Sequence, residues 1–271
     1  MSSTGAKLAV IGFGAMGRAL TVGLIEHGVF GAGDVVVTDV DAGKRAAAVD
    51  ELGVREASSN TEAVTGAETI VIAVKPQDTG SALADIERAI TPAQLIVSIA
   101  AGISIQTIES HLPVGTPVVR VMPNTPSLVG AGAAAFSLGT NGRPEHAEKV
   151  SRMLSAVGLA LEVPEKLLDA VTGLSGSGPA YVYLMIETLA DAGVSVGLPR
   201  ATANALAAQT VLGAAKMVIE TGQHPASLRD AVASPGGTTI AGLTALERSG
   251  FRAAIINAVQ AATKRSQELT G

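Results

Sequence analysis

The chain has 271 residues, of which 47% are apolar and only 2% aromatic. That length allows two domains and a sizeable core, which must rely on contacts between small residues because aromatic anchors are scarce. The net charge of −5 disfavours a nucleic-acid partner, and the lack of cysteine excludes disulfides and thiol catalysis. The four histidines show no ligand-like spacing, so we expect no metal site.

Strand and helix patterns alternate over residues 1–164. Short apolar or β-branched runs predict strands at 7–11, 35–38, 69–74, 95–99, 117–121, 132–137 and 161–163. Helical patterns between them cover the stretch that ends near residue 27, then 42–52, 78–90, 105–111 and 144–157. Such alternation is typical of a parallel sheet with helices on both faces. We therefore predict an α/β fold with an N-terminal, Rossmann-type doubly wound sheet.

The first strand runs directly into Gly12-Phe-Gly14-Ala-Met-Gly17, and Asp39 ends the second strand. In a strand–turn–helix context this spacing is the dinucleotide-binding fingerprint. Gly12 would form the tight turn, Gly14 would admit the pyrophosphate, and Gly17 would allow close packing of helix on strand.

Asp39 bears on which nicotinamide cofactor binds. A carboxylate there accepts hydrogen bonds from ribose hydroxyls and repels a 2′-phosphate, whereas Lys44 and Arg45 lie near enough to bind that phosphate. Because these charges conflict, both NADPH and NADH stay open, and we expect NADH to be usable.

Three later strands end in small residues and prolines, at 73–76, 98–102 and 121–126. Lys75 would lie at the carboxyl edge of the sheet, where open α/β folds bind their ligands. Any one of these ends alone reads as an ordinary turn. Together they predict a flat wall for a planar nicotinamide.

The pattern changes near Pro164, and no clear strand follows. Helices are predicted over 180–192, 200–220, 227–233, 239–249 and 251–268, so residues 165–271 form an all-helical domain. Residues 173–179 read as a loop that caps the first of these helices, with Ser177 as N-cap. That helix is apolar nearly all round and must be buried, which points to a second subunit as its cover. No apolar run reaches the roughly 18 residues of a membrane span, so we expect a cytoplasmic protein without a membrane segment.

Ser-Pro-Gly-Gly-Thr-Thr at 234–239 interrupts the helical half. A proline and two glycines disfavour a helix by several kcal/mol, so the break is a feature of the fold. One interpretation is an anion site, made of free backbone N–H groups, two hydroxyls and a helix N-terminus. The other is a helix–helix turn with a threonine cap. The motif alone does not separate them.

Five segments of the chain resemble pyrroline-5-carboxylate reductases, and this resemblance covers essentially the whole chain. They are Val10–Gly17, Ala73–Pro76, Met122–Pro126, Asp169–Tyr181 and Ser234–Ile240. The last two are the specific ones, since the first is shared by many dinucleotide-binding folds. The resemblance implies reduction of 1-pyrroline-5-carboxylate to L-proline with NADPH or NADH, the last step of proline biosynthesis. It also implies a homodimer formed through the C-terminal helices, often assembled further into a decamer.

The resemblance also assigns site residues at the matching positions. Cofactor contacts are implied at Gly12, Phe13, Gly14, Ala15, Met16, Gly17, Asn60, Ala73, Val74, Lys75, Pro76, Ala100 and Ala101. Substrate contacts are implied at Ser234, Gly236, Gly237, Thr238 and Thr239, with Thr239 near the imine nitrogen as the catalytic residue. Two positions depart from the family pattern. Asp39 stands where NADPH-preferring members tend to carry a neutral residue, and Thr238 stands where alanine is frequent.

The chemistry of a cyclic imine with one carboxylate suits these residues. A protonated C=N carbon already accepts hydride, so the enzyme must hold the carboxylate and the iminium N–H but need not supply a strong acid. Neither Tyr181 nor Tyr183 is followed by the lysine of a Tyr-x-x-x-Lys pattern, which disfavours hydroxyacid dehydrogenases that transfer a proton. Two alternatives stay open: another two-domain imine or β-hydroxyacid reductase, and a non-catalytic nicotinamide-binding regulator. We further expect the 234–239 site to be completed at or near a dimer interface.

Overall fold

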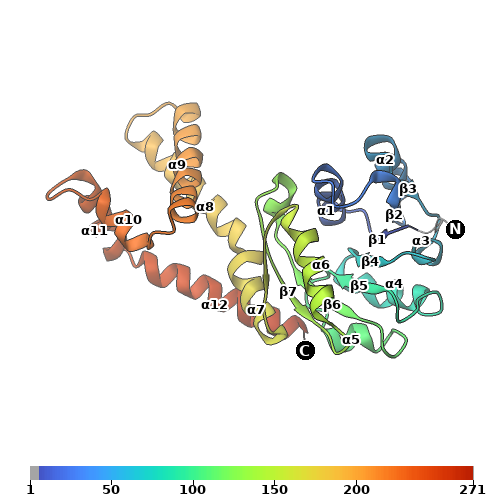
Figure 1. Cartoon of the computed structure of the whole chain (residues 1–271). Coiled ribbons are helices and arrows are strands. Elements are labelled where there is room, and N and C mark those ends of the chain that lie inside the picture. The colour runs from blue at the N-terminus through green and yellow to red at the C-terminus, as the bar shows by residue number, and fades with distance from the viewer. Residues whose placement is uncertain (1–5, 271) are drawn as a thin grey trace. The chain divides into compact units, whose positions relative to one another are not determined.

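The computed structural model describes residues 6–270, which fall into two compact units (Figure 1). The first unit takes in the chain as far as Gly176 together with the segment from Ala262 onward. The second unit is Ser177–Ala261. Each unit has its own core and is described separately below.

The first unit is built on an eight-stranded sheet with the order β3-β2-β1-β4-β5-β6-β7-β8. The strands are β1 Leu8–Ile11, β2 Val35–Thr38, β3 Arg55–Glu56, β4 Thr69–Ile72, β5 Leu95–Ser98, β6 Val118–Met122, β7 Gly132–Leu138 and β8 Gly158–Glu162. The order of its first six strands is that of a doubly wound dinucleotide-binding sheet, which confirms the predicted fold class.

Helices cover both faces of this sheet, which explains why its central strands read as unbroken apolar runs. One face packs against α1 Ala15–Glu26, α2 Ala42–Leu52 and α6 Pro144–Ser155. The other packs against α3 Asn60–Val64, α4 Thr79–Ile86 and α5 Ile105–Glu109. Successive residues of β1 alternate between the two cores: Val10 belongs to the first, and Ala9 and Ile11 to the second.

The predicted parallel pairing fails at one strand, β7, which pairs antiparallel to β6. The connection between these strands holds a short 3₁₀ turn, Thr125–Val129, and no crossover helix. A parallel return needs a crossover of a dozen or more residues, so this short link forces the strand to reverse. β8 then runs parallel to β7, because α6 supplies a crossover between them.

Several predicted boundaries also need correction. The last strand begins at Gly158 and not at Leu161, because the preceding helix ends at Ser155 and leaves Val157 outside it. α4 ends at Ile86, short of the predicted Ile90. The two-residue strand β3 and the one-turn helix α3 were not predicted, since elements of this length carry too few residues to show a period.

Residues 165–176 continue the first unit as a helical segment. The capping loop predicted at 173–179 is absent, because a π-helical turn leads almost directly into the next helix. A 3₁₀ turn at Glu165–Leu167 leads into α7 Leu168–Val171, then a π-helical turn at Thr172–Gly176, then α8 Gly178–Ser195. Ser177 stands at the N-cap position but makes no side-chain cap hydrogen bond. Its own backbone is helical, so no break in the helix is present for it to cap.

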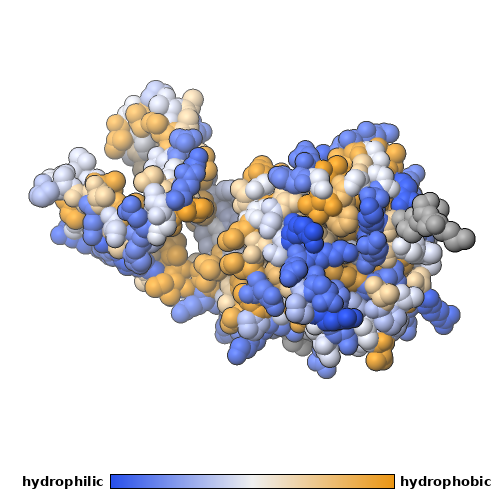
Figure 2. All heavy atoms as spheres, viewed as in Figure 1, coloured by the Kyte–Doolittle hydropathy of each residue, from blue (hydrophilic) through white to orange (hydrophobic). Residues whose placement is uncertain are grey.

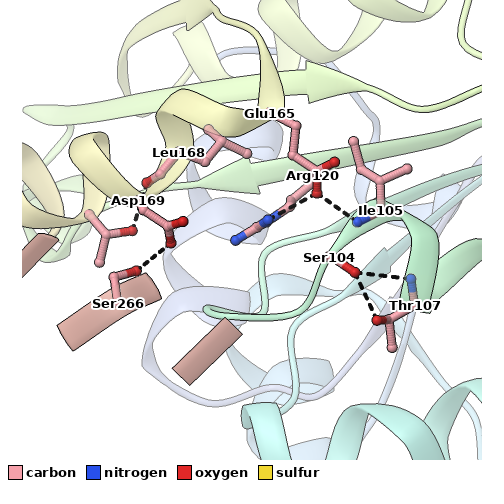
Figure 3. Close-up of polar contacts among 9 residues, drawn as sticks. Ser104, Ile105, Thr107, Arg120, Glu165, Leu168, Asp169 and Ser266 are labelled. Atoms are coloured by element: carbon pink, nitrogen blue, oxygen red, sulfur yellow. Dashed lines mark hydrogen bonds and ion pairs between the residues drawn. The ribbon is translucent and has the colours of Figure 1, made fainter. Parts of the chain in front are cut away.

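Three hydrogen bonds fasten this segment inside the first unit (Figure 3). The carboxylate of Glu165 accepts hydrogen bonds from the Arg120 guanidinium of β6 at 2.9 Å and from the Ile105 N–H of α5 at 2.7 Å. The Ser266 hydroxyl of α12 Phe251–Thr270 donates to Asp169 of α7 at 2.7 Å. The two ends of the C-terminal half are therefore both held on the first unit.

The second unit contains α8, α9 Arg200–Thr221, α10 Pro225–Ala231, α11 Thr238–Arg248 and the first half of α12. No strand follows β8 in the described residues, as predicted. α8 and α9 pack through Ala190, Ala203 and Ala207, the close small-residue contact that the composition indicated.

Much of the second unit's apolar surface is uncovered in a single chain. Figure 2 shows apolar patches over its helices, and Leu184, Leu212 and Ile219 are each more than half exposed. Only Ala190 of α8 is fully buried, so the chain alone does not provide the burial expected for this helix. Within residues 6–270, no helix is both long and apolar enough to cross a membrane.

Candidate active site

The turn after β1 requires two of its three glycines for packing. Gly12 has φ +93°, and a Cβ there would lie 2.8 Å from the backbone of Ala73. At Gly17, an added Cβ would clash with the carbonyl oxygen of Gly12. These two glycines are explained by the contact of α1 with the ends of β1 and β4.

Gly14 has no such packing reason, since a Cβ there would meet no atom within 4 Å. It stands at the N-cap of α1 and offers no side-chain cap hydrogen bond. The first N–H groups of α1 have no intrahelical acceptors, and the position beside Gly14 is open. Open space beside the free N–H groups of a helix is what a pyrophosphate needs, so these residues fit a dinucleotide.

Asp39 follows β2 and lies beside this turn. Its carboxylate accepts the Phe13 N–H at 2.8 Å and the Asp41 N–H at 2.9 Å, and its side chain is only 8% exposed. The Lys44 ammonium lies 3.6 Å from the same carboxylate and is about half exposed. The Arg45 guanidinium instead donates to the Asp39 carbonyl oxygen at 2.6 Å.

A cleft of about 430 Å³ opens at this edge of the sheet. It brings together seven of the predicted cofactor residues, namely Gly12, Gly14, Asp39, Asn60, Ala73, Val74 and Lys75. They come from the ends of β1, β2 and β4 and from the start of α3. Residues as far apart in sequence as Gly12 and Lys75 thus line one cavity.

The cleft is also lined by residues that the sequence reasoning missed. Asp78, Ser81, Ala82 and Asp85 lie along one side of the 3₁₀ turn Pro76–Asp78 and α4. Their spacing of three, four and seven residues marks a single helix face. The spacing is visible in the sequence, but the sequence does not indicate that this helix face lines a cleft. Asp85 also accepts a hydrogen bond from the Asn60 amide at 3.0 Å.

The remaining predicted cofactor residues do not line this cleft. They are Phe13, Ala15, Met16, Gly17, Pro76, Ala100 and Ala101. The Phe13 side chain is buried in the core below α1, so only its backbone can face a ligand. Ala100 is also buried, whereas Ala15, Pro76 and Ala101 are exposed. Their assignment as cofactor contacts stays a prediction.

α3 is held at the rim of the cleft by its own N-terminal hydrogen bonds. Ser59 caps the helix by accepting the Glu62 N–H at 3.1 Å. Hydrogen bonds from the Ser58 hydroxyl and the Ser58 N–H lower the pKa of the Glu62 carboxyl. Both contacts keep Asn60, at the first position of this helix, in place.

The Ser234–Thr239 segment lies in the second unit and forms a tight turn between α10 and α11. Gly236 adopts φ +68°, and the Gly237 N–H donates to the Ser234 carbonyl oxygen at 3.0 Å. α11 then begins at Thr238 without a side-chain cap hydrogen bond on Gly237.

The turn combines features of both interpretations that the sequence allowed. It joins two helices, yet it leaves the first N–H groups of an 11-residue helix open next to two threonine hydroxyls. The Thr239 residue is half-buried, whereas Thr238 is exposed. The turn itself contains no titrating acid or base, so it can bind an anion and donate hydrogen bonds.

Sequence comparison relates almost the whole chain to curated proteins. It is 46% identical to the pyrroline-5-carboxylate reductase of Methanosarcina acetivorans over 263 residues, which cover 97% of each chain. It is 47% identical to the enzyme of the same name from Synechocystis over 263 residues, 97% of this chain and 98% of the relative.

The chain belongs to the pyrroline-5-carboxylate reductase family. Enzymes of this family catalyse the last step of proline biosynthesis. The predicted resemblance is thereby confirmed.

Family models match both parts of this family member. Residues 165–269 match the model described as pyrroline-5-carboxylate reductase dimerisation. Residues 7–102 match the model described as NADP oxidoreductase, coenzyme F420-dependent. The C-terminal helices are thus a dimerisation domain, and the chain forms a homo-oligomer through them.

Solved pyrroline-5-carboxylate reductases share the fold. The structure from Coxiella burnetii superposes with a TM-score of 0.93 at 35% identity, covering 98% of this chain and 99% of that one. The Plasmodium falciparum structure, which has NADP bound, gives 0.87 at 34% identity and covers 98% of each chain. This structure and the NADP oxidoreductase model support a nicotinamide cofactor, which fits the cleft described above.

Proposed function

We propose that this chain reduces 1-pyrroline-5-carboxylate to L-proline, with the cofactor in the cleft beside Gly14 and the substrate on the Ser234–Thr239 turn. The observation that supports it best is the makeup of that turn. It presents helix N–H groups and two hydroxyls but no acid or base. Such a site suits a substrate that carries one carboxylate and arrives as a protonated imine.

Each part of the site has a limited task in this proposal. A reduced nicotinamide, when bound, supplies the hydride. The N–H groups that open α11 bind the substrate carboxylate, and the Thr239 hydroxyl accepts a hydrogen bond from the iminium N–H. Holding two reactants in a near-attack geometry lowers a barrier by about 7–11 kcal/mol, so positioning alone is an adequate source of catalysis.

Thr239→Ala is expected to lower kcat/KM for the imine by about one to two orders of magnitude, the scale of a lost hydrogen bond to a charged group. Thr238→Ala is the matched control, since only its backbone N–H is assigned to binding, and its kinetics should stay near wild type. Steady-state kinetics of both variants make the comparison. Unchanged kinetics in Thr239→Ala would remove Thr239 from the site.

Both NADH and NADPH are part of the proposal, with NADH usable. Each Asp39 oxygen accepts one backbone N–H and keeps lone pairs for a ribose hydroxyl. A 2′-phosphate would add negative charge beside a carboxylate that is 8% exposed. The half-exposed ammonium of Lys44 offsets part of that repulsion.

The deciding experiment follows oxidation of NADH and of NADPH with 1-pyrroline-5-carboxylate as substrate. Turnover with either cofactor supports the proposal. Turnover only of a different imine or of a β-hydroxyacid in a substrate panel would favour the other two-domain reductases. Cofactor binding without turnover of any substrate would favour a regulator.

The proposal extends to assembly and location. The isolated chain leaves most of the Ser234–Thr239 turn exposed, and the dimerisation helices surround it in sequence, so we assign its completion to a partner subunit. The same proposal includes three further points. Dimers assemble into a decamer, the dinucleotide-binding domain ends at residue 164 and the substrate-binding domain begins at residue 165, and the protein is cytoplasmic. Light scattering of the purified protein tests the assembly.

A further inference from the structure

The chain passes from the first unit to the second between a π-helical turn and a helix that has a proline in its first turn. The π-helical turn Thr172–Gly176 ends the first unit, and α8 begins at Gly178. Pro179 is the second residue of α8 and has no N–H. In a regular helix, residue 179 would donate to the Ser175 carbonyl oxygen, so this carbonyl lacks its usual donor. The next N–H, that of Ala180, donates to Ser177.

The side chain of Asn124 supplies the missing donor. Its Nδ2 donates to the Ser175 carbonyl oxygen at 3.0 Å, and its Oδ1 accepts the Ala133 N–H of β7 at 2.8 Å. Asn124 is 9% exposed. Its two partners are backbone groups of fixed polarity, so they determine which way the amide points.

Asn124 also stands close to the edge of the sheet that holds the cofactor cleft. It comes two residues after Met122, the last residue of β6, and β6 runs parallel to β5. The carboxyl ends of β1, β4, β5 and β6 therefore share one edge. Met122 touches the same helical turn, since a Cβ added at Gly176 would lie 2.5 Å from its methyl group.

We propose that Asn124 is a positioning residue, which holds the π-helical turn and thereby fixes the direction in which α8 leaves the first unit. The inference rests on the proposed function, because α8 opens the unit that carries the Ser234–Thr239 turn. If the π-helical turn were mobile, the Ser234–Thr239 turn would occupy several positions. Hydride transfer depends steeply on distance, so it would slow even though both ligands still bind.

Asn124→Asp removes one of the two hydrogen bonds of this side chain and keeps the other. The carboxylate keeps the size of the amide and still accepts the Ala133 N–H, but it cannot donate to Ser175. We expect kcat to fall by about tenfold or more, because misplacement by about 1 Å can slow catalysis a hundredfold. The Kd of the reduced cofactor, measured by its fluorescence, should stay near that of the wild type. Hydrogen exchange of residues 173–182 should become faster.

Asn141→Asp is the matched control, since it makes the same change at an exposed position between β7 and α6. Its kcat, cofactor Kd and hydrogen exchange should equal those of the wild type.

Pro179→Ala provides a second, independent test. Residue 179 then has an N–H for the Ser175 carbonyl oxygen, so the Asn124 amide becomes redundant. We expect the loss of kcat caused by Asn124→Asp to shrink to about threefold or less in this background, a non-additivity that reports a shared partner. If Asn124→Asp alone does not fold, the double variant must fold and turn over.

Three results would overturn the proposal. The first is wild-type kcat and exchange in Asn124→Asp. The second is a loss of cofactor affinity as large as the loss of kcat, which would place Asn124 in the cofactor site. The third is an equal loss of kcat from Asn124→Asp in the wild-type chain and in the Pro179→Ala variant. If the wild-type chain does not reduce 1-pyrroline-5-carboxylate, the proposed function fails. The hydrogen-exchange measurement alone then decides whether Asn124 holds the π-helical turn.

Discussion

The Asp39 carboxylate accepts two backbone N–H groups and lies 3.6 Å from the Lys44 ammonium. Its position therefore follows partly from the fold, because it anchors the turn after β1 through Phe13. In the proposed function, the same group accepts hydrogen bonds from a ribose and repels a 2′-phosphate. The proposal thus links the local structure of this turn to the choice between NADH and NADPH.

Asp39→Ser should shift the ratio of kcat/KM toward NADPH by about tenfold, which corresponds to about 1.4 kcal/mol. Removal of the carboxylate leaves Lys44 free to pair with a 2′-phosphate. Kinetics with both cofactors measure the shift. Asp50→Ser, at an exposed position of α2, removes the same charge away from the cleft and should leave the ratio unchanged. An unmoved ratio in Asp39→Ser would mean that the carboxylate does not face the ribose.

The segment from Glu165 to Gly176 is short, but it links several elements of the first unit. Glu165 holds it to β6 and α5, Asp169 holds it to α12, and Asn124 holds its last turn. The Arg120 guanidinium is the most enclosed charge in this set, with a side chain 7% exposed. We therefore expect its ion pair with Glu165 to stabilise the fold more than an exposed ion pair does.

Glu165→Gln should lower the free energy of unfolding by about 1–3 kcal/mol, because it leaves the buried guanidinium without a counter-charge. This range is reduced from that of a fully buried pair, since the Glu165 side chain is 34% exposed. Urea unfolding at one protein concentration provides the measurement. Glu51→Gln, which breaks the exposed Arg18–Glu51 pair at 2.7 Å, should change stability by less than about 1 kcal/mol. Equal effects of the two changes would contradict this account.

The second unit as a whole leaves many large apolar side chains exposed in a single chain. Helices that match a dimerisation family expose Leu184 of α8 and Leu212 of α9 to solvent in a single chain. Large exposed apolar patches mark interaction sites. The low aromatic content fits this picture, because many small side chains let helices from two subunits approach closely.

Leu184→Asp should weaken the dimer by at least about tenfold in Kd, since burial of a leucine side chain contributes about 1.5–3 kcal/mol. Sedimentation over a range of concentrations gives the Kd. Gln106→Asp adds the same charge at an exposed position of α5 in the first unit and should leave assembly unchanged. If Leu184→Asp sediments as the wild type does, α8 is not part of the interface.

Much of the molecule could be read from local patterns. The glycine spacing after β1, the Asp39 position and the β-branched runs predicted the sheet and the cofactor end of the chain. Motifs over the whole length predicted the family, and the relatives confirm it. These features are local, because turn geometry and strand burial on both faces act within a few neighbouring residues.

Other features were missed because they depend on partners far away in sequence. The direction of β7 follows from what its short connection allows, and the α4 face becomes part of the cleft only once the sheet brings it there. The helical course of 173–179 was likewise misread as a loop, since its glycines, serines and proline favour one locally. The hydrogen bond from the Asn124 amide to the Ser175 carbonyl oxygen counters that tendency.

The amino-acid pattern was therefore enough for the fold class, the dinucleotide turn and the family. The residues that line the cleft with Gly14, the reversal of β7 and the π-helical turn before α8 emerged only in three dimensions. The physical reason is the range of the forces involved. Backbone preferences and hydrophobic periods act between neighbours, whereas a buried amide such as Asn124 joins groups that are 51 residues apart.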